Sequence, residues 1–273
     1  MTIPTSPLSH DDTALYVETR GSGPLLLLIP GGPQDAGVFD GLAEALADRF
    51  TVLTYDPRGN SRSPFGGDPS DLDLDLHGDD AAGLIDAVGS GPAFVFGTSG
   101  GAQIGLNLAA RHPDRVAVLV AHEPPCVLLL DDPTDALAAD EAVYAAYRAG
   151  GVDAAFATFL EVSGMAGDED GPPEPPSDAE AATFGRMEGN MDAFFAHGMR
   201  SLSEYVPDVA ALRAGAPRVV VGLGEQSGGT LTGAASRALA DRLGVAPVLF
   251  PGDHVAYTYA AEPFATRLAA VLS

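Results

Sequence analysis

Residues 93–101 read Ala-Phe-Val-Phe-Gly-Thr-Ser-Gly-Gly, and this stretch decides the fold. Its first four residues are apolar and predict a short buried strand, while residues 101–111 have the pattern of a helix. Ser99 stands at the turn between the two. A serine on a tight strand-to-helix turn has a strained backbone that exposes its hydroxyl, and the flanking glycines let strand and helix approach. The helix N-terminus behind it favours developing negative charge. The stretch therefore predicts a nucleophilic serine at position 99.

Short apolar runs alternate with helical patterns on both sides of this turn. The sequence predicts strands at 15–19, 24–30, 51–55, 93–96, 116–121, 218–222 and 247–250, and helices at 38–47, 79–88, 101–111, 232–243 and from 262. Alternation of this kind is typical of an α/β fold with a mostly parallel central sheet flanked by helices on both faces.

The alternation stops between residues 124 and 214, where the pattern is mainly helical, with a loop at 167–177 rich in Gly, Pro, Asp and Glu. We expect a core domain formed by residues 1–123 and 215–273, and a helical cap insertion at 124–214 that shapes the substrate pocket. Six side chains are candidates to line that pocket, although packing is the commoner role for each: His122, Cys126, Phe194, Phe195, His197 and Tyr205.

A serine nucleophile needs a base, and the base needs an acid that orients it. In a strand–turn–helix site of this kind the histidine follows the last strand. His254 occupies that position, just after the strand predicted at 247–250. The other five histidines precede the turn, lie at the ends of predicted elements or fall in the insertion. His254 is therefore the predicted general base.

Three motifs give the chain a family resemblance. Residues 30–33, Pro-Gly-Gly-Pro, resemble a His-Gly-Gly-Pro loop, and residues 55–63, Tyr-Asp-Pro-Arg-Gly-Asn-Ser-Arg-Ser, resemble an Asp-x-Arg-Gly-x-Gly-x-Ser segment. With the serine turn, they make the chain resemble α/β-hydrolases of the proline-iminopeptidase and small-esterase kind. The resemblance implies an α/β-hydrolase fold and an oxyanion hole formed by the backbone N–H groups of Gly32 and Gly100. Asp56 and Arg58 are expected to brace the loop.

The position that holds the acidic residue in the family does not hold one in this sequence. The family places an aspartate in a Gly-x-x-Asp turn after the insertion, where this chain has Ser227. Glu123 follows the strand predicted at 116–121, the position that haloalkane-dehalogenase-like members use for their acid. Glu225 lies on the same loop as Ser227. We expect Glu123 to be the acid, with Glu225 as the alternative; Asp253, or no acid at all, is the third option.

Composition and charge limit the classes of partner that the protein is expected to bind. The 273 residues carry a formal charge of −24, which disfavours nucleic acid and anionic membranes. No apolar run is long enough to span a bilayer, and the N-terminus has no basic stretch followed by an apolar one, so we expect a cytoplasmic protein. The single cysteine excludes an intrachain disulfide and a multi-cysteine metal site. We expect a small-molecule substrate, no metal and no cofactor; a homodimer stays open.

Taken together, the motifs predict a serine hydrolase that acts on a small ester, thioester, lactone or amide through Ser99, His254 and Glu123 and an acyl-enzyme. A lyase, cyclase or perhydrolase would use the same residues. A non-catalytic ligand-binding protein on the same fold is the alternative from another class, favoured by Ser227 at the usual position of the acid.

Overall fold

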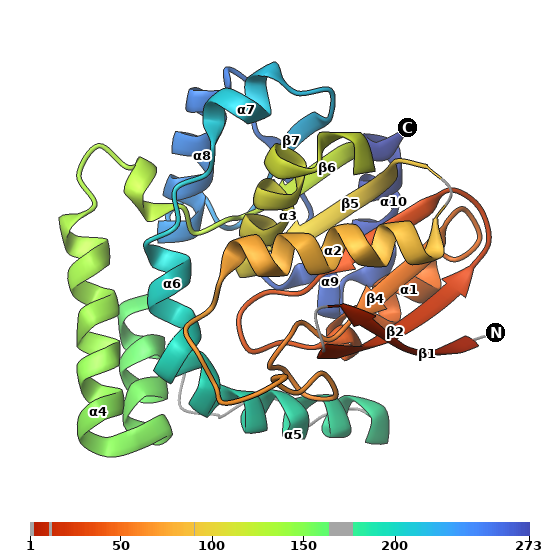
Figure 1. Ribbon diagram of the computed structural model, residues 1–273. Helices are drawn as coiled ribbons and strands as arrows, with labels where there is room; N and C mark the ends of the chain where they lie inside the picture. Colours follow the sequence, from red (N-terminus) through yellow and green to blue (C-terminus); the bar gives the residue numbers. More distant parts are fainter. Residues whose placement is uncertain (1–2, 11–12, 90, 164–176) are drawn as a thin grey trace.

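In the part of the chain that the structure describes, eight strands form one sheet in the order β1-β2-β4-β3-β5-β6-β7-β8 (Figure 1). The computed structural model describes residues 3–10, 13–89, 91–163 and 177–273. β1 pairs antiparallel with β2, and β2 with β4, while the remaining pairs are parallel. The predicted mostly parallel sheet is therefore confirmed. The strands are β1 (Ile3–His10), β2 (Thr13–Gly21), β3 (Leu25–Ile29), β4 (Thr51–Tyr55), β5 (Ala93–Thr98), β6 (Val116–His122), β7 (Arg218–Gly224) and β8 (Val248–Phe250).

Strand β3 shows why the sheet needs helices on both faces. It lies between β4 and β5 and consists of apolar residues without alternation. Leu27 and Ile29 belong to the hydrophobic cluster on one face, while Leu26 and Leu28 belong to the cluster on the other. All four side chains are fully buried. A continuous apolar strand of this kind is stable only where both faces are covered.

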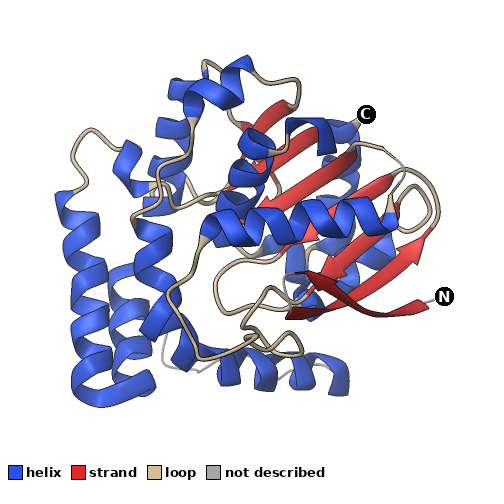
Figure 2. Ribbon diagram, viewed as in Figure 1, coloured by secondary structure: helices blue, strands red, loops and turns tan. Residues whose placement is uncertain are grey.

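The helices supply that cover (Figure 2). One cluster packs the sheet against α2 (Leu74–Val88), α3 (Gly100–Arg111), α7 (Val209–Ala214) and α8 (Leu231–Leu243). The other packs it against α1 (Asp40–Leu46), α9 (Ala256–Tyr259) and α10 (Ala261–Leu272). Short 3-10 helices, η1 (Ala36–Phe39) and η2 (Pro113–Arg115), join neighbouring elements.

The chain between β6 and β7 is helical. It contains η3 (Val127–Leu129), α4 (Thr134–Ser163), α5 (Asp178–Ala193), the π-helical turn η4 (Phe194–Gly198), α6 (Met199–Ser203) and α7. Helix α4 turns back on itself at Gly151, whose φ of 74° lies in the left-handed region. Figure 1 shows α4 and α5 beside the sheet rather than on its faces. A separate small cluster of buried residues joins these helices: Val143, Ala155, Phe195 and Met199.

Some boundaries differ from the sequence prediction. The helix predicted at 79–88 starts at Leu74, because the Asp73 carboxylate accepts hydrogen bonds from the backbone N–H groups of Asp75 and Leu76 and caps the first turn. β1 and α9 were not predicted. The predicted loop at 167–177 falls outside the described residues except for Ser177, which caps α5. Among the described residues, no helix is both long and apolar enough to cross a membrane.

Candidate active site

Ser99 occupies the turn between β5 and α3. Its φ and ψ are 53° and −126°, a conformation that side chains rarely adopt. The glycines around it are needed because the backbones touch. A Cβ on Gly97 would lie 2.3 Å from the carbonyl oxygen of Gly101, and one on Gly101 would lie 2.2 Å from that of Ile29. The Ser99 side chain is partly exposed at the carboxyl end of the sheet.

His254 lies in the loop after β8 and contacts Glu123, which follows β6. His254 Nδ1 is 2.6 Å from Glu123 Oε2. The other carboxylate oxygen, Oε1, accepts a hydrogen bond of 2.7 Å from the backbone N–H of Gly224, and Thr232 Oγ1 donates to Oε2 at 3.1 Å. The structure thus places His254, the predicted base, in contact with Glu123, the residue expected to be the acid.

The Glu123 carboxyl is fully buried and charged. Burial alone would raise its pKa, but the hydrogen bond with His254 outweighs this and lowers the pKa to about 2. Glu123 also has a positive φ of 48°, which is uncommon for a residue with a side chain. The carboxylate is thus buried, stands on strained backbone and has three polar partners.

The other candidate acids have different surroundings. Glu225 is exposed, and its backbone N–H bonds to the carbonyl of Phe250. The Asp253 carboxylate accepts from the backbone N–H of Val255 at 3.0 Å and stabilises its own turn. Ser227, at the family's acid position, is 1% exposed and lies beside Glu123.

His122 contacts both the turn at Ser99 and the ring of His254, a role that the sequence analysis did not predict. Its carbonyl oxygen accepts the Ser99 N–H at 2.9 Å, and its ring stacks on that of His254 with centroids 6.3 Å apart. Burial lowers the pKa of His122 to about 3, so the ring is neutral. Among the described residues, no hydrogen bond yet joins the Ser99 hydroxyl to His254. Such bonds are often long without substrate and tighten in the complex.

Gly32 and Gly100 bring two backbone N–H groups close together beside Ser99. A Cβ added to Gly100 would lie 3.3 Å from the nitrogen of Gly32. A Cβ on Gly31 would lie 2.7 Å from Ser99 Cβ, so the loop passes directly against the serine. Gly32 has a positive φ of 48°. This arrangement has the parts that an oxyanion hole requires.

The model of the family described as alpha/beta hydrolase fold matches residues 24–226. The chain belongs to the α/β-hydrolase fold family. The hydrolase YraK of Bacillus subtilis is 32% identical over 274 residues, which cover 98% of this chain and 96% of that protein. 2-(Acetamidomethylene)succinate hydrolase of Mesorhizobium japonicum is 38% identical over 109 residues, 39% of this chain and 38% of that protein. A thermophilic esterase from Thermogutta terrifontis, at 20% identity, shares the fold with a TM-score of 0.74 over 100% of this chain and 98% of its own.

Side chains from two directions hold the loop of residues 30–34, which we name the oxyanion loop after the role that the family resemblance implies. Asn60 Nδ2 donates to the carbonyl oxygens of Gly32, at 3.0 Å, and Gln34, at 2.8 Å. Asn190 of α5 donates to the carbonyl of Pro33 at 2.8 Å and also accepts the N–H of Ser61 at 2.7 Å. Asn190 was not predicted from the sequence, because its partners lie far away along the chain.

Asp56 braces the segment after the loop, in the manner expected from the motif, and Arg58 binds to α2. Asp56 is fully buried and accepts from the backbone N–H of Ala36 and from the Arg62 guanidinium. Arg58 forms a two-point ion pair with Asp80, with distances of 3.0 and 2.7 Å. Both carboxylates are compensated by these contacts.

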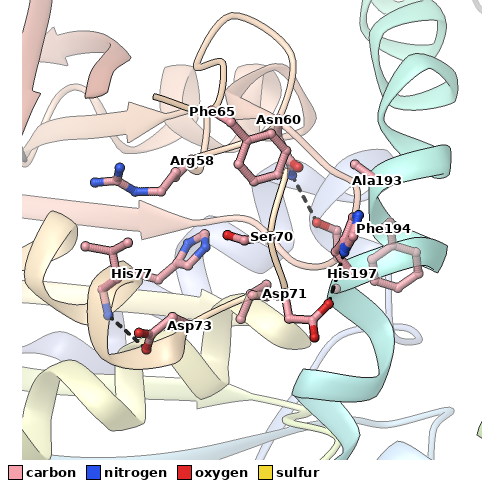
Figure 3. A pocket seen from close by; sticks show the side chains of 14 residues that line it. Arg58, Asn60, Phe65, Ser70, Asp71, Asp73, His77, Ala193, Phe194 and His197 are labelled. Carbon is pink, nitrogen blue, oxygen red and sulfur yellow. Dashed lines mark hydrogen bonds and ion pairs between the residues drawn. The ribbon is translucent and has the colours of Figure 1, made fainter. Parts of the chain in front are cut away.

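The predicted pocket-lining residues divide into two groups. Phe194 and His197 line a hollow beside the oxyanion loop (Figure 3). His122, Cys126 and Phe195 are 0–1% exposed and take part in packing, the commoner role expected for each. Tyr205, partly buried, packs against the main cluster. Within the described residues, no group of His, Cys, Asp and Glu side chains has the arrangement of a metal site.

Proposed function

We propose that this protein is a serine hydrolase that cleaves a small ester, thioester, lactone or amide through an acyl-enzyme on Ser99. The observation that carries the proposal is the 2.6 Å contact between His254 Nδ1 and Glu123 Oε2, together with a serine on a strained turn whose N–H bonds to the carbonyl of His122, the residue before Glu123. This contact fixes the proton of a neutral imidazole on Nδ1 and leaves Nε2 as the basic nitrogen.

The reaction follows from these positions. His254 Nε2 takes the proton of the Ser99 hydroxyl, whose oxygen attacks the carbonyl carbon. The charge on the resulting oxyanion is stabilised by the N–H groups of Gly32 and Gly100, in a site that is already arranged for it. The imidazolium, stabilised by Glu123, gives its proton to the leaving group. A water molecule, deprotonated by His254, then releases the acyl group and restores the serine.

We also propose that residues 124–214 form a cap over a core of residues 1–123 and 215–273. Two contacts support this division of roles. A Cβ on Gly32 would face the ring of Phe194 at 3.5 Å, and a Cβ on Gly100 would lie 2.9 Å from the side chain of Leu202. Both oxyanion glycines are thus covered by residues of the insertion, which would limit the size and shape of the acyl compound that reaches Ser99.

Hydrolysis is favoured over lyase, cyclase or perhydrolase chemistry by the names of two relatives: the uncharacterized hydrolase YraK, at 32% identity, and 2-(acetamidomethylene)succinate hydrolase, which matches 109 residues. Running the reaction in H₂¹⁸O separates hydrolysis from lyase and cyclase chemistry: hydrolysis places one ¹⁸O atom in the released acid, whereas a lyase or cyclase product carries none.

A fluorophosphonate probe tests the serine directly. We expect one adduct on Ser99 by peptide mass spectrometry, and none in Ser99→Ala, with both proteins folded by circular dichroism. An unlabelled Ser99 in the folded wild-type protein would contradict the enzyme proposal and favour a ligand-binding protein.

A further inference from the structure

Two adjoining hollows lie beside the oxyanion loop, and we call them together the inner pocket. Gly32, Arg58, Asn60, Leu72 and His77 line both of them. Figure 3 shows the larger hollow, with side chains of the 58–77 segment on one side and of η4 on the other. The segment before α2 and the helical insertion therefore close this pocket together.

The inner pocket has a defined position relative to the proposed chemistry. The smaller hollow is lined by Gly32 and Gly100, the two glycines of the oxyanion hole. His254 is not among the described residues that line either hollow. In acyl transfer the leaving group must face the histidine that protonates it, so the acyl chain extends to the other side. If Ser99 acts as proposed, the inner pocket lies on the acyl side.

His77 is the unusual residue of this pocket. It is only 5% exposed, and among the described residues its Nδ1 has no hydrogen-bond partner. Buried polar atoms without partners are rare and destabilising, and they call for an explanation. Burial lowers the pKa of His77 to about 4, so the ring is neutral at pH 7. In Figure 3 the ring points into the hollow between Arg58 and Ser70.

A histidine held in this way is suited to bind a ligand. The ring borders both hollows, so rotation about its Cβ–Cγ bond turns a nitrogen toward a bound molecule without moving the backbone of α2. A neutral imidazole offers one donor and one acceptor. Apolar side chains around it, Phe65, Leu72 and Phe194, suit a short carbon chain.

The charges around His77 select a neutral ligand group. The Arg58 guanidinium is paired with Asp80, which is 1% exposed. Two further carboxylates, those of Asp71 and Asp73, line the larger hollow. The Asp71 carboxylate contacts His197 Nδ1 at 3.0 Å. A ligand carboxylate here would meet these negative charges, whereas a carbonyl, ether or hydroxyl oxygen would not.

We infer that the inner pocket holds the acyl part of the substrate, and that His77 hydrogen-bonds to a neutral oxygen near the far end of that acyl chain. The substrate class is an ester or related compound of a short oxo-, alkoxy- or hydroxy-acid. The inference rests on the proposed function for the position of the bond that is cleaved. It rests on His77 for the oxygen in the acyl chain of the substrate.

Matched substrates test the inference. The p-nitrophenyl esters of 4-oxopentanoate and pentanoate differ only in the distal carbonyl, and those of 5-oxohexanoate and hexanoate repeat the comparison one methylene further. For at least one pair we expect the wild-type kcat/KM to favour the oxo ester by about tenfold, as one hydrogen bond provides. In His77→Leu that ratio should fall to about 1, while the plain ester is still cleaved.

The controls separate recognition from folding and from catalysis. His112→Gln removes a histidine that bonds to Asp79 of α2, away from the pocket, and should keep the wild-type ratio. Cleavage of the plain ester by His77→Leu, and its loss in Ser99→Ala, show that the proposed function holds whatever the ratio is. A wild-type ratio near 1 in both pairs, or a ratio unchanged in His77→Leu, overturns the inference. If the p-nitrophenyl monoester of succinate, which ends in a carboxylate, is preferred over the pentanoate ester, the inference that the bound oxygen is neutral is wrong.

Discussion

Replacing Glu123 with glutamine is the sharpest test of the catalytic arrangement, since the change keeps size and removes charge. The N–H of Gly224 donates to Oε1 at 2.7 Å, so the glutamine oxygen must stay there. The amide nitrogen then replaces Oε2, which lies 2.6 Å from His254 Nδ1. Because an amide nitrogen only donates, the imidazole must turn its lone pair to it and carry its proton on Nε2.

That tautomer cannot accept the proton of Ser99. The acid-to-amide change in a serine protease triad lowers kcat by about 10⁴, and we expect a loss of about 10³–10⁴ here, or roughly 4–5.5 kcal/mol in the activation free energy. The assay is kcat on a p-nitrophenyl ester, with the labelling rate of Ser99 by a fluorophosphonate as a second measurement. Unchanged KM and near-ultraviolet circular dichroism would show that the fold and the binding of substrate persist.

Glu225→Gln is the matched control, because Glu225 is exposed and lies on the neighbouring loop. We expect its kcat to stay within about twofold of wild type, as for surface substitutions in general. The reasoning is refuted if Glu123→Gln keeps a tenth or more of the wild-type kcat, or if Glu225→Gln loses as much as Glu123→Gln.

Three further predictions concern the same site. Gly31→Ala should lower kcat by about 10²-fold or more, because its Cβ would stand 2.7 Å from that of Ser99, whereas Gly228→Ala, with open space around it, should not. Asn190→Ala should lower kcat by about tenfold with little change in KM, because oxyanion donors act chiefly in the transition state; an unchanged kcat would contradict its positioning role. The pKa of Glu123 is about 2 in the folded protein, against 4.5 for the free side chain. This difference stabilises the folded state by about 3 kcal/mol above pH 4.5, and the stabilisation is lost as the pH falls toward 2. Acid-induced melting should therefore be steeper in wild type than in Glu123→Gln.

Local sequence patterns predicted most of the strands and helices of the sheet domain. The strand predicted at 51–55 agrees with β4, and the serine turn is bounded by β5 and α3 where the glycine spacing places it. These predictions succeed because a doubly covered strand must be continuously apolar and a tight turn needs glycines. β1 was missed because residues 3–10, Ile-Pro-Thr-Ser-Pro-Leu-Ser-His, neither alternate nor form an apolar run. It pairs at the sheet edge through its backbone, which leaves little trace in the sequence.

The site residues that the sequence missed act through distant contacts. Asn190 lies 129 positions from Ser61, whose N–H it accepts, and nothing near either residue announces the pairing. The importance of His77 comes from a buried ring nitrogen without a partner, and burial of one atom is a property of the packed structure. A pattern search finds residues whose chemistry depends on near neighbours along the chain, such as Ser99, and misses those that depend on the packing of separate elements.

The position of the acid shows how the site tolerates this departure from the family pattern. β6 and β7 are parallel neighbours, so the residues after them face the same space. A Cβ on Gly224 would lie 2.8 Å from Ser227 Oγ and 3.0 Å from Glu123 Oε1, which means that both side chains approach one point. We therefore expect that an acid from either strand end can serve His254.

This geometry predicts that the acid can be moved. Glu123→Gly removes the carboxylate and suits the positive φ of that position, and it should abolish most activity. Adding Ser227→Asp in the same chain supplies a carboxylate beside the vacated space, and we expect it to restore kcat by about tenfold or more over the single variant. Ser227→Asn, equal in size and uncharged, should restore nothing. If the aspartate does no better than the asparagine, the two strand ends are not equivalent, and the family pattern depends on more than the placement of charge beside His254.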